Sequence, residues 1–93
     1  MEKEKKEEEY LSELDVLEDD GASLVLHNDD YHTFDYVILA LEEICGLTTL
    51  QAEQCTHLVH YKGKCVVKKG SYEDLMPMHQ ALLDRKLTSE VIK

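Results

Sequence analysis

A small α+β sandwich is the fold class that this chain favours, with three helices covering a three-stranded antiparallel sheet in the order β-α-α-β-α-β. Short apolar runs bounded by turn-forming residues alternate with longer segments in which apolar residues recur every three or four positions. These are the patterns of strands and helices. A chain of 93 residues with 43% hydrophobic residues can bury one core but not two. We therefore expect one folded domain over residues 22–93, after an acidic extension over residues 1–21.

The extension carries most of the negative charge. Residues 1–20 hold ten acidic and three basic residues, so they contribute −7 of the net charge of −10. Such a segment buries too little apolar surface to offset its ordering entropy, and we expect it to be disordered. Leu11, Leu14 and Leu17 recur within it at intervals of three, so docking of this segment onto a partner stays open.

The overall composition excludes several classes of protein. The acidic balance would repel a phosphate backbone, so we expect no nucleic-acid binding. No apolar run approaches the roughly 18 residues of a membrane span, and the N-terminus lacks the apolar region of a secretory signal. The cysteines number three, which is odd. We therefore expect a soluble protein of the reducing cytoplasm that does not associate with a membrane.

A short apolar run and a long periodic segment predict the first strand and the first helix. Leu24 to Leu26 form an apolar run that is too short for a helix and is followed by turn-forming Asn and Asp, which favours a buried strand. Thr33 is a suitable N-cap and Gly46 a suitable C-cap for the helix that follows. The apolar positions of this helix fall on one face: Phe34, Val37, Ile38, Leu41, Ile44 and Cys45.

The second helix is predicted from the signals at its two ends. Thr48 and Gln51 form a capping-box pattern at its start, and Gly63 ends it. The following segment KCVVKK, residues 64–69, is typical of a strand with Cys65 and Val67 on one side and Val66 on the other. Its lysines suit an edge strand or another exposed position.

A proline complicates the prediction of the third helix. Ser71 is a suitable N-cap, but Pro77 lies about a turn and a half further on and has no backbone N–H. We therefore expect a short turn over residues 71–76 and the main helix from Pro77 to about Arg85. Residues 87–92 then close the domain as the last strand.

The cysteines and histidines form no recognisable catalytic or metal site. Cys55 and His57 lie two residues apart, so on a helix they point to different sides and cannot act as nucleophile and base. The spacing of Cys55, His57, His60 and Cys65 matches no zinc pattern. We therefore expect no enzyme activity, no metal and no cofactor.

The best candidates for function lie between the first strand and the first helix, in the elbow His27-Asn28-Asp29-Asp30. The elbow places an amide and two carboxylates where a plain turn needs fewer polar groups. With Asn28 and Asp30 at the mouth between the first two helices and His60 approaching from the second, the three groups suit an ammonium ion. Asp29 is then assigned to stabilising the turn. A turn without any ligand stays open, because Asn and Asp are common turn residues.

An apolar wall would lie beneath the ammonium site. Its members come from facing sides of the first two helices: Phe34, Val37, Thr56 and Val59. A cation site above an apolar cavity suits a peptide N-terminus, with the α-amino group at the rim and the first side chain inside.

Two motifs resemble those of a known family. The first is Leu26-His27-Asn28-Asp29-Asp30-Tyr31, followed by Thr33-Phe34 and Val37. The second, about thirty residues later, is Val59-His60-Tyr61-Lys62-Gly63-Lys64. Together they resemble the ClpS family of adaptor proteins, which deliver N-degron substrates to a Clp-type AAA+ unfoldase and its protease. The likeness covers about residues 24–92.

The resemblance implies a monomeric adaptor without catalytic activity. Its partners would be a Clp-type AAA+ unfoldase, engaged by the N-terminal extension, and protein substrates that begin with Leu, Phe, Tyr or Trp. Asn28, Asp30 and His60 would bind the substrate α-amino group. The side-chain pocket would be lined by Phe34, Val37, Thr56, Val59 and Leu87. The alternative is a domain that docks on a Clp ATPase without recognising N-terminal residues.

The sequence departs from the family pattern in three places. Phe34 stands where many members have methionine, and Thr56 where a larger apolar residue is common. The run Leu75-Met76-Pro77-Met78 replaces an Ala-Glu-Thr-Lys run. These differences leave open the preference among the four N-terminal residues and the identity of the unfoldase.

Overall fold

The order of elements along the chain is the expected β-α-α-β-α-β. The computed structural model describes residues 21–93. The disorder expected for residues 1–20 lies outside the described residues. Gly21, the last residue of the expected extension, begins the first strand. The elements are β1 (Gly21–His27), α2 (Phe34–Cys45), α3 (Thr49–Lys62), β2 (Lys64–Ser71), α4 (Tyr72–Asp84) and β3 (Thr88–Ile92).

The sheet has β1 at its centre. Its strand order is β2-β1-β3 and both pairings are antiparallel, which confirms the predicted three-stranded antiparallel sheet. Alternate residues of β1 face the core, so Ala22, Leu24 and Leu26 are all buried there. β2 is an edge strand, as its lysines suggested, and its Val67 is buried whereas Val66 is exposed.

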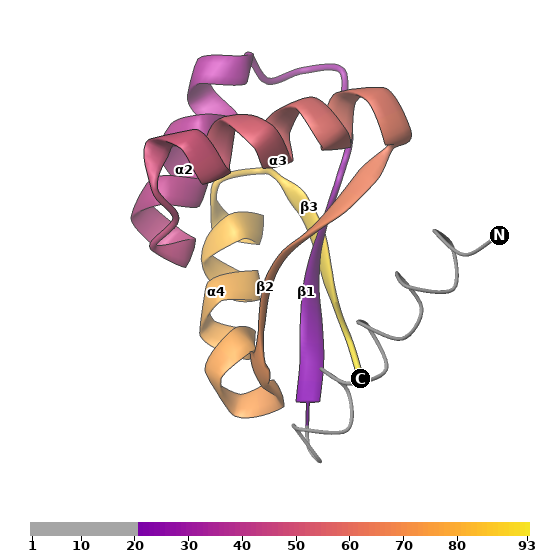
Figure 1. The fold of residues 1–93 in the computed structure, drawn as a ribbon. Helices are drawn as coiled ribbons and strands as arrows, with labels where there is room; N and C mark the ends of the chain where they lie inside the picture. The colour runs from indigo at the N-terminus through magenta and orange to yellow at the C-terminus, as the bar shows by residue number, and fades with distance from the viewer. Residues whose placement is uncertain (1–20) are drawn as a thin grey trace, which may run out of the picture.

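The helices gather against the sheet and against one another. Figure 1 shows α4 running alongside the strands, while α3 crosses near α2 at one end of the sheet. α4 contacts all three strands, and α2 and α3 contact each other. Among residues 21–93, no helix has the length and apolar character that a membrane crossing requires. The largest fully buried side chains are Leu24, Leu26, Leu41, Cys45, Leu75 and Leu82.

The helix ends are formed by the residues that the sequence indicated. The hydroxyl of Thr33 accepts the N-cap hydrogen bond of α2, and Thr48 and Gln51 complete the capping box of α3. Gly46 and Gly63 end these helices at φ angles of 70° and 91°, which L side chains rarely adopt. These predictions are confirmed because caps depend on residues that are close in the sequence.

The predicted helix break at Pro77 is wrong. α4 runs without interruption over residues 72–84 with Pro77 inside it, and Ser71 is its N-cap. An interior proline costs about 3 kcal/mol. However, Leu75 before it and Leu82 after it are 1% and 0% exposed, and burying each leucine contributes about 1.5–3 kcal/mol. Burial on both sides of the proline therefore outweighs its cost, and Pro77 itself faces solvent.

Candidate functional site

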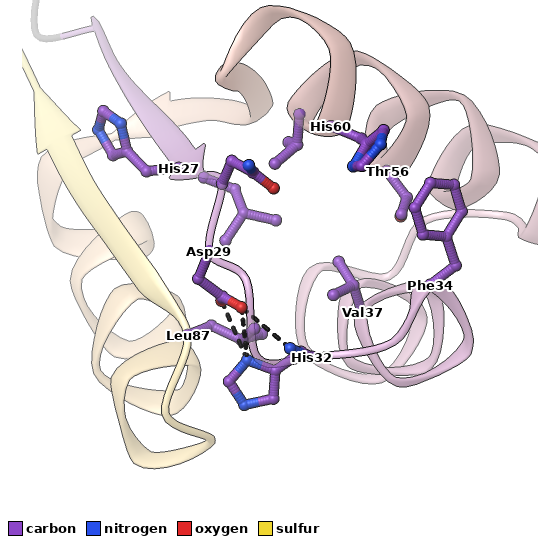
Figure 2. A pocket seen from close by; sticks show the side chains of 11 residues that line it. His27, Asp29, His32, Phe34, Val37, Thr56, His60 and Leu87 are labelled. Carbon is purple, nitrogen blue, oxygen red and sulfur yellow. Dashed lines mark hydrogen bonds and ion pairs between the residues drawn. The ribbon is translucent and has the colours of Figure 1, made fainter.

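The elbow between β1 and α2 is folded around the carboxylate of Asp29. This carboxylate accepts hydrogen bonds from the backbone N–H groups of Tyr31 (2.9 Å) and His32 (3.0 Å), and lies 3.0 Å from His32 Nδ1 (Figure 2). These bonds satisfy donors that the turn would otherwise leave unpaired. The predicted role of Asp29 in stabilising the turn is confirmed.

Asp29 is also a source of fixed negative charge. Its side chain is 16% exposed. Burial raises the pKa of this carboxyl, but the hydrogen bonds from the Tyr31 backbone and from the His32 side chain and backbone outweigh burial and hold the pKa below its ordinary value. Asp29 is therefore ionised at neutral pH.

A backbone hydrogen bond ties the elbow to the end of α3. The N–H of Asn28 donates to the carbonyl oxygen of Gly63 at 2.9 Å. Gly63 is the C-cap of α3, and His60 lies in the last turn of that helix. This bond brings the elbow next to His60, although the two segments are about thirty residues apart in the sequence.

A cavity of about 40 Å³ opens between the elbow, α2 and α3. Figure 2 shows Asp29 and Phe34 on opposite sides of it. The lining includes seven of the eight residues proposed for the site from the sequence, and Asp30 is the exception. The lining residues are Leu26, His27, Asn28, Asp29, His32, Phe34, Val37, Thr56, Val59, His60 and Leu87.

The two elbow carboxylates differ in position. Asp29 lines the cavity, whereas Asp30 is exposed and is not part of the lining. Asp29 is therefore the carboxylate that the elbow directs toward the cavity while it also holds the turn. The role assigned to Asp30 in binding an α-amino group stays a prediction.

Four lining residues were not among the expected pocket residues, and two of them carry a signal in the sequence. The side chain of an Asp in a turn commonly accepts hydrogen bonds from backbone N–H groups two or three residues later, which is an Asx-turn. This pattern would have predicted that the Asp29 side chain points into the elbow. Leu26 lies two residues before Asn28, which directly follows β1, and residues two apart in an extended chain point to the same side. His27 and His32 carry no comparable signal.

The floor of the cavity is apolar. Val59 and Leu87 are 5% and 3% exposed, and Thr56 is 3% exposed. The hydroxyl of Thr56 donates to the carbonyl oxygen of Ala52 at 2.7 Å within α3. Its proton is thus used inside the helix, so the wall is less polar than the presence of a threonine suggests.

The three cysteines lie outside the cavity lining. Burial raises the pKa of Cys45 to about 11. A hydrogen bond with the Cys65 thiol lowers the pKa of Cys55 to about 7 against the effect of burial, and the same bond raises the pKa of Cys65. Within residues 21–93, no group of three or more His, Cys, Asp or Glu residues is arranged to hold a metal ion. The cavity combines an amide, a carboxylate and imidazoles with apolar side chains on its floor.

The comparisons with known proteins agree on one family. The family model described as ATP-dependent Clp protease adaptor protein ClpS matches residues 18–90. The ATP-dependent Clp protease adapter protein ClpS of Thermosynechococcus vestitus is 35% identical over 66 residues, which are 70% of this chain and 70% of that protein. The protein of the same name from a Nostoc species is 36% identical over 66 residues, with 70% and 68% covered.

A solved structure has a similar fold. Agrobacterium tumefaciens ClpS2, bound to L-phenylalaninamide, aligns with a TM-score of 0.71 at 18% identity. The alignment covers 77% of this chain and 94% of that chain. At this identity the likeness concerns the arrangement of the backbone.

Proposed function

Because the chain belongs to the ClpS family of ATP-dependent Clp protease adaptor proteins, we propose that its pocket holds the N-terminal residue of proteins that are handed to a Clp-type AAA+ unfoldase for degradation. Membership of this adaptor family means that the chain is not an enzyme. The N-terminal residues that we expect are Leu, Phe, Tyr and Trp. The observation that carries the proposal is an amide, an ionised carboxylate and an imidazole around one cavity whose floor is apolar.

The polar groups suit an α-ammonium group. An ammonium has three N–H donors, and the side chains of Asn28, Asp29 and His60 all offer acceptors at the cavity. The negative charge of Asp29 balances the positive charge of the ligand. Asp30 is a second candidate for this charge, and its side chain would have to turn toward the mouth. The A. tumefaciens protein supports the proposal, because the L-phenylalaninamide in its structure carries an α-amino group beside an apolar ring.

The size of the cavity favours a side chain of moderate volume. By the same measure about 10–15 Å³ holds one water molecule, so a cavity of about 40 Å³ holds about three. This space suits leucine better than tryptophan. We expect peptides that begin with Leu to bind at least as tightly as peptides that begin with Trp.

Fluorescence anisotropy with short labelled peptides tests the proposal. The peptides begin with Leu, Phe, Tyr, Trp, Ile or Met, and each is made with a free and with an acetylated amine. Acetylation removes the positive charge, so we expect it to weaken binding of the four preferred residues by at least about tenfold. Equal binding of the free and acetylated peptides would refute recognition of the amino group.

Single substitutions then assign the polar groups. A hydrogen bond to a charged group contributes about 1.5–3 kcal/mol, so Asn28→Ala and His60→Ala should each weaken binding of free-amine peptides by about tenfold or more. Comparing Asp29→Asn with Asp30→Asn decides which carboxylate meets the ammonium, and the cavity lining favours Asp29. Glu73→Gln, an exposed charge change on α4, is the matched control.

The alternative of a docking domain predicts a different pattern. A domain that only docks on a Clp ATPase would bind none of these peptides, and it would bind the ATPase equally well with Asn28→Ala or His60→Ala. Pull-down of a purified Clp ATPase with the wild-type chain and with these two variants, beside the anisotropy series, therefore separates the two functions.

A further inference from the structure

Four rings form a continuous series from the rim of the pocket onto the outer surface of α3. The ring of Phe34 meets His57 edge-on at 5.1 Å and His60 at 5.3 Å between centroids. The rings of His57 and Tyr61 are nearly parallel, at 9° and 6.1 Å, and His60 meets Tyr61 edge-on at 5.3 Å. His57 and Tyr61 are four residues apart and so lie on the same side of α3. We call these two residues the ring shelf.

The ring shelf is exposed, yet it is continuous with the pocket. Tyr61 is 77% exposed and His57 is also exposed, and neither lines the cavity. Phe34 and His60 line the cavity and contact the shelf as well. The flat surface of the shelf therefore begins where the cavity ends.

The geometry of an amino-acid residue determines where a bound peptide leaves the pocket. The ammonium, side chain and carbonyl groups of the first residue point to different corners of its tetrahedral α-carbon. With the ammonium among Asn28, Asp29 and His60 and the side chain inside the cavity, the carbonyl and the second residue are left at the open rim of the cavity. Figure 2 shows Phe34 across the cavity from Asp29, and Phe34 is the ring that contacts His57. The second residue therefore leaves toward the ring shelf.

We propose that the ring shelf formed by His57 and Tyr61 receives the side chain of the second residue of a bound peptide and favours an aromatic residue at that position. This inference rests on the proposed function of the pocket. Aromatic rings attract one another beyond the effect of buried area, and they do so in the stacked and edge-on arrangements that an exposed ring pair can offer. A small polar side chain such as serine gains neither contact.

Peptides that differ only at the second residue test the proposal. Leu-Trp, Leu-Phe and Leu-Ser peptides with identical remaining sequences are titrated with the full chain by fluorescence anisotropy. For the wild-type chain, the dissociation constant of Leu-Ser should exceed that of Leu-Trp or Leu-Phe by about two- to tenfold. Tyr61→Ala should lower this ratio to about one, and Tyr61→Phe should keep it. Leu50→Ala, at a position of α3 that is 63% exposed, should also keep it.

The outcomes separate this inference from the proposed function. A ratio of dissociation constants near one in the wild-type chain, or an unchanged ratio in Tyr61→Ala, overturns the role of the ring shelf. In either case, weaker binding of the Leu-Ser peptide after acetylation of its amine still supports the pocket. Loss of all peptide binding in the wild-type chain overturns both. A ratio that falls in Tyr61→Ala and persists in Tyr61→Phe and Leu50→Ala supports the ring shelf.

Discussion

Replacing Asp29 by alanine should destabilise the domain at neutral pH far more than replacing Asp30. The Asp29 carboxylate accepts from two backbone N–H groups at 2.9 and 3.0 Å and contacts His32 Nδ1 at 3.0 Å. Hydrogen bonds to a charged group contribute about 1.5–3 kcal/mol, but water can replace part of them at an exposed turn, so we expect a loss of about 2 kcal/mol. In a domain of this size that loss lowers Tm by about 8–16 °C.

The pH dependence of the loss has a definite sign. The hydrogen bonds lower the pKa of Asp29 in the folded state. The carboxylate therefore contributes stability above its unfolded pKa of about 3.9, and this contribution is lost as the pH falls through the folded value. Thermal melts followed by circular dichroism should show the largest gap between wild type and Asp29→Ala at pH 7. The gap should shrink below about pH 4.

Asp30→Ala is the matched control for this prediction. Asp30 neighbours Asp29 in the same elbow but is exposed, and surface substitutions of this kind change stability by within about 0.5 kcal/mol. If Asp30→Ala lowers Tm as much as Asp29→Ala, or if the gap for Asp29→Ala persists in acid, the ionised Asp29 carboxylate does not stabilise the elbow.

Three further experiments test the rest of the structure. Alkylation of Cys55 by iodoacetamide, followed by mass spectrometry of peptides, should reach half of its maximal rate near pH 7. Cys65→Ala should move this midpoint toward the ordinary thiol pKa of about 8.5. An unchanged midpoint would show that Cys65 does not lower the pKa of Cys55. Pro77→Ala should stabilise the domain by about 1–2 kcal/mol in urea unfolding, because alanine restores a hydrogen bond inside α4. A loss of stability would mean that the proline fits its site better than its missing N–H suggests. Leu82→Ala should lower the free energy of unfolding by about 2–5 kcal/mol and Leu83→Ala by much less, because these two leucines are 0% and 40% exposed. Equal losses in the two variants would contradict the position of Leu82 in the core.

Much of the fold follows from patterns that are local in the sequence. Thr33, Thr48 and Ser71 are N-caps because each hydroxyl accepts from an N–H group three residues later. Gly46 marks a helix end because it adopts a left-handed conformation without strain. Lysines predicted that β2 is an edge strand. Each of these features depends on partners within a few residues or on contact with water.

The interruption predicted at Pro77 failed because its outcome depended on distant contacts. The cost of the proline is local, and it was read correctly from the sequence. The gain comes from Leu75 and Leu82, which are buried against other elements of the fold. A pattern within one helix contains no information about how completely the rest of the fold will cover its apolar face. The sequence of α4 alone therefore could not show that burial of the leucines outweighs the cost of the proline.

The pocket shows the same division. Helix periodicity predicted that His60 shares a face of α3 with Thr56 and Val59, and the excess of polar groups in the elbow indicated Asn28. The hydrogen bond from Asn28 to Gly63 then brings the two halves together. The direction of the adjacent carboxylates was decided by the folded elbow, where Asp29 is drawn inward by N–H donors that Asp30 does not meet. Such a choice depends on the three-dimensional path of the turn, since adjacent acidic residues have the same chemistry and differ only in where the backbone points them.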